Sequence, residues 1–302
     1  MEWSSAVSRK IAVIWSIAFA ASVVGVIASA QHRFRFHDET RAEPLNLEPA
    51  TVNPGVNRSE ITEQGRALSI TGNGIPNHLV GRFPNKGNPH QIAEQSVKLN
   101  FPAVPRANAT PTPLRMGWNF GVSLTGVVFD PLAAEFWHGD PRSGWSYNAL
   151  GGAIALGLDA NFAHVQPNGE YHYHGVPTGL IEMQGGSPKE HSPLIGYAAD
   201  GFPIYARTGL VGGKVTQMTS SYRLKVGQRP GGAAPDGRHD GTFNEDYEFV
   251  AGLGALDECN GAMTVSAAFP SGTYAYFLTD DYPVVPRCFA GTPDPSFRFG
   301  PR

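Results

Sequence analysis

Residues 194–207 read LIGYAADGFPIYAR, and this stretch carries the clearest local signal in the 302-residue chain. Two runs rich in strand-forming residues flank the tetrapeptide AADG at 198–201. An Asp-Gly pair between apolar runs is a strong signal of a β-hairpin. Because Pro203 has no backbone N–H, we expect the second strand to lie at a sheet edge or to begin near this residue.

The region that follows Met116 shows a similar pattern of short strands. Apolar residues alternate with other side chains over 118–124, a second apolar run covers 126–129, and Asp130-Pro131 supplies a turn. This pattern predicts a pair of strands before the turn. Residues 131–137 (PLAAEFW) then predict a helical turn.

The composition agrees with many short strands that are joined by turns. The chain has 36 glycines and 25 prolines, while 41% of its residues are apolar and can fill a core. We therefore expect a mainly β fold, a sandwich- or barrel-like antiparallel domain with long Gly/Pro-rich loops and few short helices.

The N-terminus has the features of an export signal. Arg9-Lys10 precedes an apolar run over 11–27, and the small residues Ala-Ser-Ala end at position 30. This order predicts a signal peptide over 1–30 that is cleaved after Ala30. The alternative is an uncleaved anchor, and only then would the protein contact a membrane, because the run approaches the ~20 residues of a span. Both readings place the protein outside the cytoplasm, as a periplasmic, cell-envelope or secreted protein.

The remaining chain divides by composition. Residues 31–66 are polar and mixed, which predicts a flexible tether. Residues 67–302 have the length of one large β-domain. The net charge of −3 gives no basic footprint, so we expect no nucleic-acid partner.

The chain has two cysteines, Cys259 and Cys288. An even pair in an exported protein predicts a disulfide. The alternative is that both cysteines belong to a metal or redox site, although their spacing matches no Cys-x-x-Cys motif.

Residues 161–175 read NFAHVQPNGEYHYHG and carry the strongest chemical signal. On a strand, His172 and His174 share one face, while Tyr171 and Tyr173 share the other. If the residues before the Pro-Asn-Gly turn form a partner strand, His164 returns beside this pair.

Three imidazoles on one face predict a metal site for zinc or copper with a vacant position for water or substrate. Metal affinity would then fall as the pH drops through the histidine range near ~6.5. The alternatives are a buried hydrogen-bonding network of histidines and a coincidence on the surface. Asp200, Asp257 and Glu258 are candidates for a further ligand or a general base. For Asp200 a structural role in the hairpin turn is the alternative, and for the other two it is an ion pair with Arg287.

Four stretches together resemble the YHYH-domain family. They are residues 163–175, 196–205, 256–261 and 279–289, and the resemblance extends over roughly residues 70–290. It implies an exported, β-rich domain and assigns no reaction.

Three functions follow from these patterns. The first is an exported metal-binding protein, such as a metal-dependent hydrolase or a copper-handling protein, with His164, His172 and His174 as ligands. The second is a non-enzymatic envelope module that binds a polysaccharide or another small-molecule ligand on platforms such as Trp118, Trp137 and Trp145. The third is a structural protein in which residues 171–174, here called the YHYH strand, form a polar core network. Whether the protein is an enzyme stays open at this point.

Overall fold

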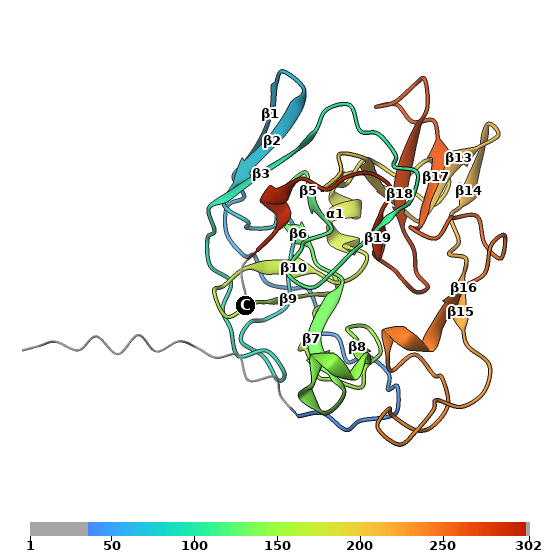
Figure 1. Cartoon of the computed structure of the whole chain (residues 1–302). Helices are drawn as coiled ribbons and strands as arrows, with labels where there is room; N and C mark the ends of the chain where they lie inside the picture. The colour runs from blue at the N-terminus through green and yellow to red at the C-terminus, as the bar shows by residue number, and fades with distance from the viewer. Residues whose placement is uncertain (1–35, 300–302) are drawn as a thin grey trace, which may run out of the picture. The chain divides into compact units, whose positions relative to one another are not determined.

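The hairpin predicted over 194–207 lies at the centre of the fold. A computed structural model describes residues 36–299, and the expected signal peptide lies outside these residues (Figure 1). Strand β11 (Gly196–Ala198) pairs antiparallel with β12 (Pro203–Ala206), so that Gly196 is opposite Ile204. Pro203 begins its strand, as one of the two alternatives predicted, and β12 is not at an edge because it also pairs with β18 (Thr273–Leu278).

Eight strands form the main sheet, in the order β17-β18-β12-β11-β5-β6-β10-β9. Most neighbours are antiparallel, whereas the β12–β18 and β6–β10 pairs are parallel. The strands not yet introduced are β5 (Gly121–Ser123), β6 (Val128–Phe129), β9 (Ala163–Val165), β10 (Tyr171–Tyr173) and β17 (Gly261–Thr264).

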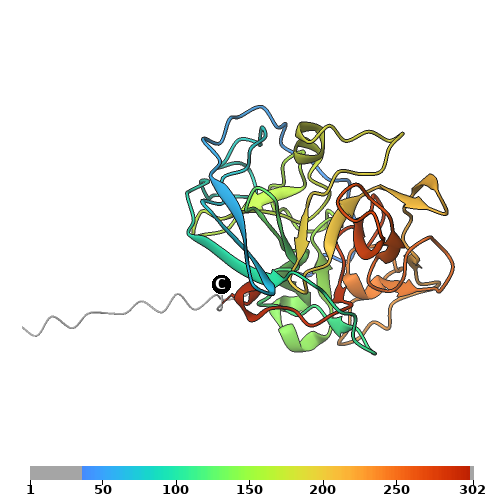
Figure 2. The same ribbon diagram turned by 90° about the horizontal axis from the view of Figure 1, so that it is seen from above.

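The structure confirms the mainly β fold and shows that the main sheet is not a closed barrel. Its two ends, β17 and β9, do not pair with each other. A three-stranded sheet is formed by β1 (Ser59–Gln64), β2 (Ala67–Gly72) and β3 (Val97–Pro102). Figure 2 shows how long loops connect these short strands.

Four two-stranded sheets complete the strands of the described part. They are β7–β8, β13–β14, β15–β16 and β4–β19, with the bounds Leu132–Phe136 and Ser146–Asn148, Thr208–Val211 and Lys214–Gln217, Tyr222–Leu224 and Tyr247–Phe249, and Thr112–Pro113 and Cys288–Phe289. The single α-helix within residues 36–299 is α1 (Thr178–Met183). In this part of the chain, no helix has the length and apolar character that crossing a membrane requires.

Two local expectations differ from the structure. The helical turn predicted over 131–137 is wrong, because residues 132–136 form strand β7 and pair with β8. The second expectation was a flexible tether over 31–66, but part of this segment pairs with the domain. Strand β1 pairs with β2 along its whole length, and Glu48 and Val52 form bridges to the domain. Backbone pairing to the domain therefore starts well before residue 67.

The two cysteines form the predicted disulfide. The bond joins Cys259, which precedes β17, to Cys288 in β19. Cys259 is buried in the main apolar core, and Cys288 packs against that core. The disulfide therefore links β19 to the segment before β17, which is one end strand of the main sheet. Strands β9 and β10 lie at the other end of this sheet.

Candidate metal centre

The histidine-containing stretch over residues 161–175 contains the hairpin β9–β10. Antiparallel pairing places His164 directly opposite His172, with Val165 opposite Tyr171. The turn closes through a bond from the Gly169 N–H to the Gln166 carbonyl. Gly169 has a φ of 88°, a left-handed conformation that suits glycine, and the methyl group of Ala93 leaves no room for a side chain there. The turn thus sets the register that brings His164 back beside the YHYH strand.

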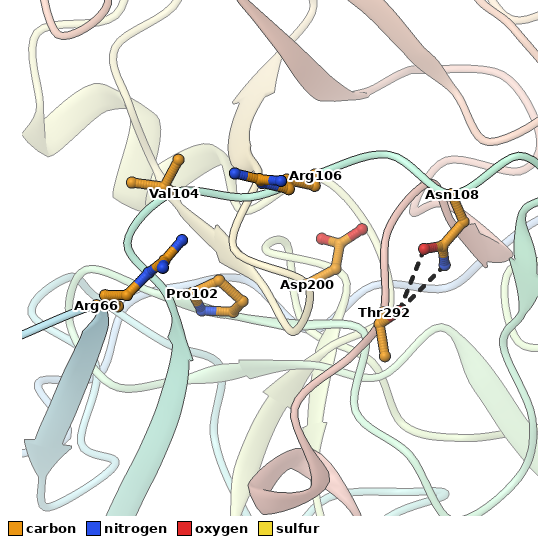
Figure 3. A pocket seen from close by; sticks show the side chains of 7 residues that line it. All are labelled: Arg66, Pro102, Val104, Arg106, Asn108, Asp200 and Thr292. Atoms are coloured by element: carbon orange, nitrogen blue, oxygen red, sulfur yellow. Dashed lines mark hydrogen bonds between the residues drawn. The ribbon is translucent and has the colours of Figure 1, made fainter.

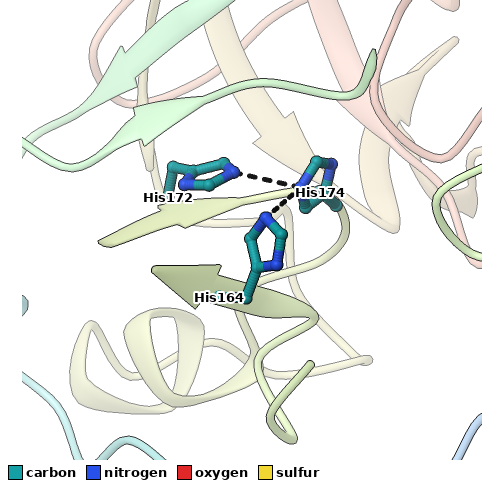
Figure 4. Close-up of side chains that lie close together, drawn as sticks. All are labelled: His164, His172 and His174. Atoms are coloured by element: carbon teal, nitrogen blue, oxygen red, sulfur yellow. Dashed lines mark hydrogen bonds between the residues drawn. The ribbon is translucent and has the colours of Figure 1, made fainter. Parts of the chain in front are cut away.

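The three histidines converge through their Nε2 atoms (Figure 4). His174 Nε2 lies 3.0 Å from His172 Nε2 and 3.1 Å from His164 Nε2. His172 and His174 are buried, whereas His164 is partly exposed. Among the described residues, these three form the one group with metal-ligand spacing, and no carboxylate belongs to it.

Backbone carbonyls fix the tautomers of two of the rings. His164 Nδ1 lies 2.8 Å from the Leu156 carbonyl, and His172 Nδ1 lies 3.3 Å from the Glu170 carbonyl. A carbonyl oxygen only accepts, so both Nδ1 atoms carry the proton of a neutral ring. The Nε2 atoms of His164 and His172 therefore present lone pairs, as metal-ligating histidines do.

This arrangement suits a cation better than a set of neutral rings. The Nε2 atom of His174 carries at most one proton, so at most one of its two close contacts is a hydrogen bond when all rings are neutral. A metal held at about 2.0–2.1 Å from imidazole nitrogens in tetrahedral geometry needs the nitrogens about 3.3 Å apart. The two spacings of 3.0 and 3.1 Å are close to this value.

The opposite face of the YHYH strand is held by a buried polar network. The Tyr171 hydroxyl donates to Asp159 Oδ2 at 2.7 Å, and the Tyr173 hydroxyl lies 2.7 Å from His78 Nε2. Burial raises the pKa of both tyrosines well above the usual value, and it also raises that of the Asp159 carboxyl, although its hydrogen-bond donors oppose the shift. These contacts anchor the strand from behind, so its histidine face has little freedom to reorganise.

The three carboxylates suggested as a further ligand or base lie elsewhere. Asp257 accepts hydrogen bonds from the Gly261 N–H at 2.8 Å and the Tyr274 hydroxyl at 2.9 Å. The Glu258 carbonyl accepts from the Tyr222 hydroxyl at 2.8 Å. Both residues therefore organise the loop before β17, and neither joins the histidine group. The ion pair considered between this loop and Arg287 is not among the ion pairs of the described residues.

Asp200 is buried at the tip of the β11–β12 hairpin. Its Oδ2 accepts from the Tyr276 hydroxyl at 2.5 Å and the Gly291 N–H at 2.8 Å. It also lines a hollow of about 300 Å³ together with Arg66, Arg106 and four other residues (Figure 3). Burial raises the pKa of this carboxyl, against the effect of its donors. Asp200 thus connects the hairpin to β18 and to the C-terminal segment, as a turn residue with a structural role would.

Sequence reasoning missed three polar groups, two beside the histidines and one on the opposite face of their strand. Asn88 Nδ2 lies 3.3 Å from His164 Nδ1 and donates to the Val165 carbonyl at 2.9 Å. Gln166 Nε2 lies 3.3 Å from His172 Nε2. The third group is His78 behind Tyr173. Asn88 and His78 are far away in the sequence, but Gln166 lies two residues beyond His164 and shares its face of the hairpin.

A family model described as YHYH protein matches residues 98–291. This match covers more than half of the chain, including both hairpins and both cysteines.

The chain belongs to the YHYH protein family.

The family match confirms the resemblance seen in the sequence and begins later than the expected residue 70. Comparison with curated proteins and with solved structures gives no match. The histidine group is therefore the feature of this YHYH protein that points to a function.

Proposed function

We propose that this YHYH protein is an exported metal-binding protein that holds one zinc or copper ion between His164, His172 and His174. The observation that carries the proposal is the convergence of three Nε2 atoms, two of them fixed as lone-pair donors by carbonyls at the other ring nitrogen. Zinc and copper both take neutral imidazole nitrogen as a ligand. The bound ion would supply Lewis acidity or, for copper, redox chemistry.

Export is the second part of the proposal. The disulfide supports it, because disulfides persist in oxidising compartments and are rare in the cytosol. The order of basic, apolar and small residues over 1–30 supports it independently. An exported location also exposes the site to the metal supply outside the cytoplasm.

The test is elemental mass spectrometry of the purified exported chain. The double variant His172→Ala/His174→Ala is measured beside it, with His138→Ala as a matched control because His138 is exposed and stacks on Trp137 outside the group. We expect close to one zinc or copper ion per chain in the wild type and in the control, and none in the folded double variant. Absence of metal in the wild type after reconstitution would refute the proposal.

A structural role for the YHYH strand is the second candidate function. The contacts of Tyr171 with Asp159 and of Tyr173 with His78 favour it, because a satisfied buried network stabilises a fold without any ligand. In that case His172→Ala would lower the free energy of unfolding equally with and without metal. Under the metal proposal, added zinc stabilises the wild type and not the variant.

The alternative of a glycan-binding module receives less support from the placement of the tryptophans. Trp137 is buried, and Trp145 packs beside it against the same apolar cluster. Trp118 is partly buried and packs against the main core. These rings serve core packing, so a stacking platform for sugars would have to be built from other side chains.

A further inference from the structure

The histidine face of the β9–β10 hairpin includes an amide side chain. Residues two apart on a strand share a face, so Gln166 lies on the same side as His164. The bond from the Gln166 N–H to the Glu170 carbonyl extends the hairpin ladder by one step beyond β9. The pairing therefore holds the backbone of Gln166 in a fixed position next to the metal group.

The amide of Gln166 reaches the ligand atom of a histidine. Its Nε2 lies 3.3 Å from His172 Nε2, and the side chain is partly buried. Because His172 Nδ1 donates to the Glu170 carbonyl, His172 Nε2 is an acceptor. Without metal, the Gln166 amide therefore donates to the lone pair that a metal ion would use.

Metal binding makes this orientation unfavourable. The lone pair of His172 then points to the ion, and an amide N–H beside a cation is repelled by it. Rotation of the amide by half a turn about its terminal bond exchanges its nitrogen and oxygen, and the oxygen then faces the ion. Amide oxygens are metal ligands in proteins, including the weak axial glutamine of some copper sites.

We infer that the Gln166 amide oxygen is the fourth ligand of this site. The inference rests on the proposed metal function and goes beyond it, because a fourth protein ligand occupies the position that water holds in an open zinc site. An external ligand would then have to displace an amide and not a water molecule.

Asn88, the other amide near the histidines, has a different role. Its Nδ2 lies beside His164 Nδ1, the ring nitrogen that faces away from the ion, and it is held by the Val165 carbonyl. Asn88 Nδ2 and the protonated His164 Nδ1 are both donors, so Asn88 only lies beside a ligand ring on its far side, while Gln166 lies at a ligand atom. Within residues 36–299 no carboxylate competes for the fourth position in the group.

The experiment uses the full exported chain and zinc alone as the probe. Zinc affinity is measured by competition with a chromophoric chelator for the wild type, Gln166→Ala, Gln166→Glu and the control Gln217→Ala, which changes an exposed glutamine of β14. The side-chain carbonyl ¹³C signal of Gln166 is assigned by its absence from Gln166→Ala and followed by NMR during zinc addition.

We expect Gln166→Ala to weaken zinc binding by about 10-fold or more, the range typical of lost support at a metal site. Gln166→Glu should restore the affinity, and Gln217→Ala should leave it unchanged. The Gln166 carbonyl signal should shift as zinc is added. A carbonyl signal that does not move, or a Gln166→Ala affinity within twofold of the wild type, would overturn the inference while leaving the three-histidine site intact. Absence of zinc binding by the wild type would instead refute the proposed function.

Discussion

His164 and His172 lie directly opposite each other across the β9–β10 hairpin, and their rings are 4.6 Å apart. Opposed residues of an antiparallel pair are the closest cross-strand neighbours. The hairpin thus supplies two ligands by pairing alone, and His174 adds the third after the end of β10. The geometry of the site therefore depends on the β9–β10 strand register, which a single turn sets.

Removal of His164 tests this dependence. His164 is partly exposed, so His164→Ala should leave the fold intact while it removes one of three ligands. We expect the loss of metal affinity to exceed the about 10–100-fold typical of an outer-shell partner. Equilibrium dialysis against zinc or copper measures it, with circular dichroism as the check of folding. An affinity equal to that of the wild type would exclude His164 as a ligand.

The network behind the strand predicts a loss of stability that is independent of metal. Tyr171→Phe removes the hydroxyl that donates to the buried Asp159 carboxylate. We expect the free energy of unfolding to fall by about 1.5–3 kcal/mol, the range for a lost hydrogen bond to a charged group, because Asp159 Oδ2 keeps its bond from the Gly81 N–H. Urea denaturation of the metal-free protein measures this difference.

The matched control for Tyr171→Phe is Tyr197→Phe. Tyr197 stacks on Phe101 in the core, and its hydroxyl has no hydrogen bond among the described contacts. Its substitution should change the unfolding free energy by much less than that of Tyr171. Equal losses for both variants would assign the effect to packing and would argue against the Tyr171–Asp159 bond.

The candidate site was predictable from the sequence to the extent that it is local. The alternation of Tyr171 to His174 with a turn before it is sufficient to place three imidazoles on one face. His78 lies 95 residues before Tyr173, so only the tertiary fold brings them together. The same alternation places Gln166 on this face, but an amide side chain in a strand does not by itself indicate a ligand.

The fold shows the same division between local and long-range information. The Asp-Gly turn at 200–201 correctly predicted the central hairpin. Residues 132–136 contain Leu, Ala and Glu, which favour helices, yet they form a strand because pairing with β8 outweighs this weak preference. The polar residues before 67 were expected to be a tether because the partner strand of β1 becomes evident only in three dimensions.

The disulfide is expected to stabilise the domain without supporting the metal site. The residues it joins are 29 positions apart. A loop of this size corresponds to about 3–4 kcal/mol in the chain-entropy description. Cys259→Ser/Cys288→Ser should lower the free energy of unfolding by this amount while metal binding persists at the other end of the sheet. Loss of metal binding in a folded double serine variant would show that the two ends are coupled.

Tyrosines near the disulfide predict an alkaline limit to stability. Burial raises the pKa of Tyr222 and of Tyr247 to about 12, and Tyr247 stacks on Tyr282 with ring centroids 3.7 Å apart. In the unfolded chain a tyrosine has a pKa of about 10. A pKa that is raised by folding means that the native state retains its proton more tightly, so the associated stability is complete below pH ~10. We expect it to be lost as the pH rises from about 10 to about 12. Ultraviolet titration of the phenolates, with Tyr222→Phe to identify one contribution, measures the transition. Ionisation of all tyrosines near pH ~10 in the still-folded protein would contradict the burial of these rings.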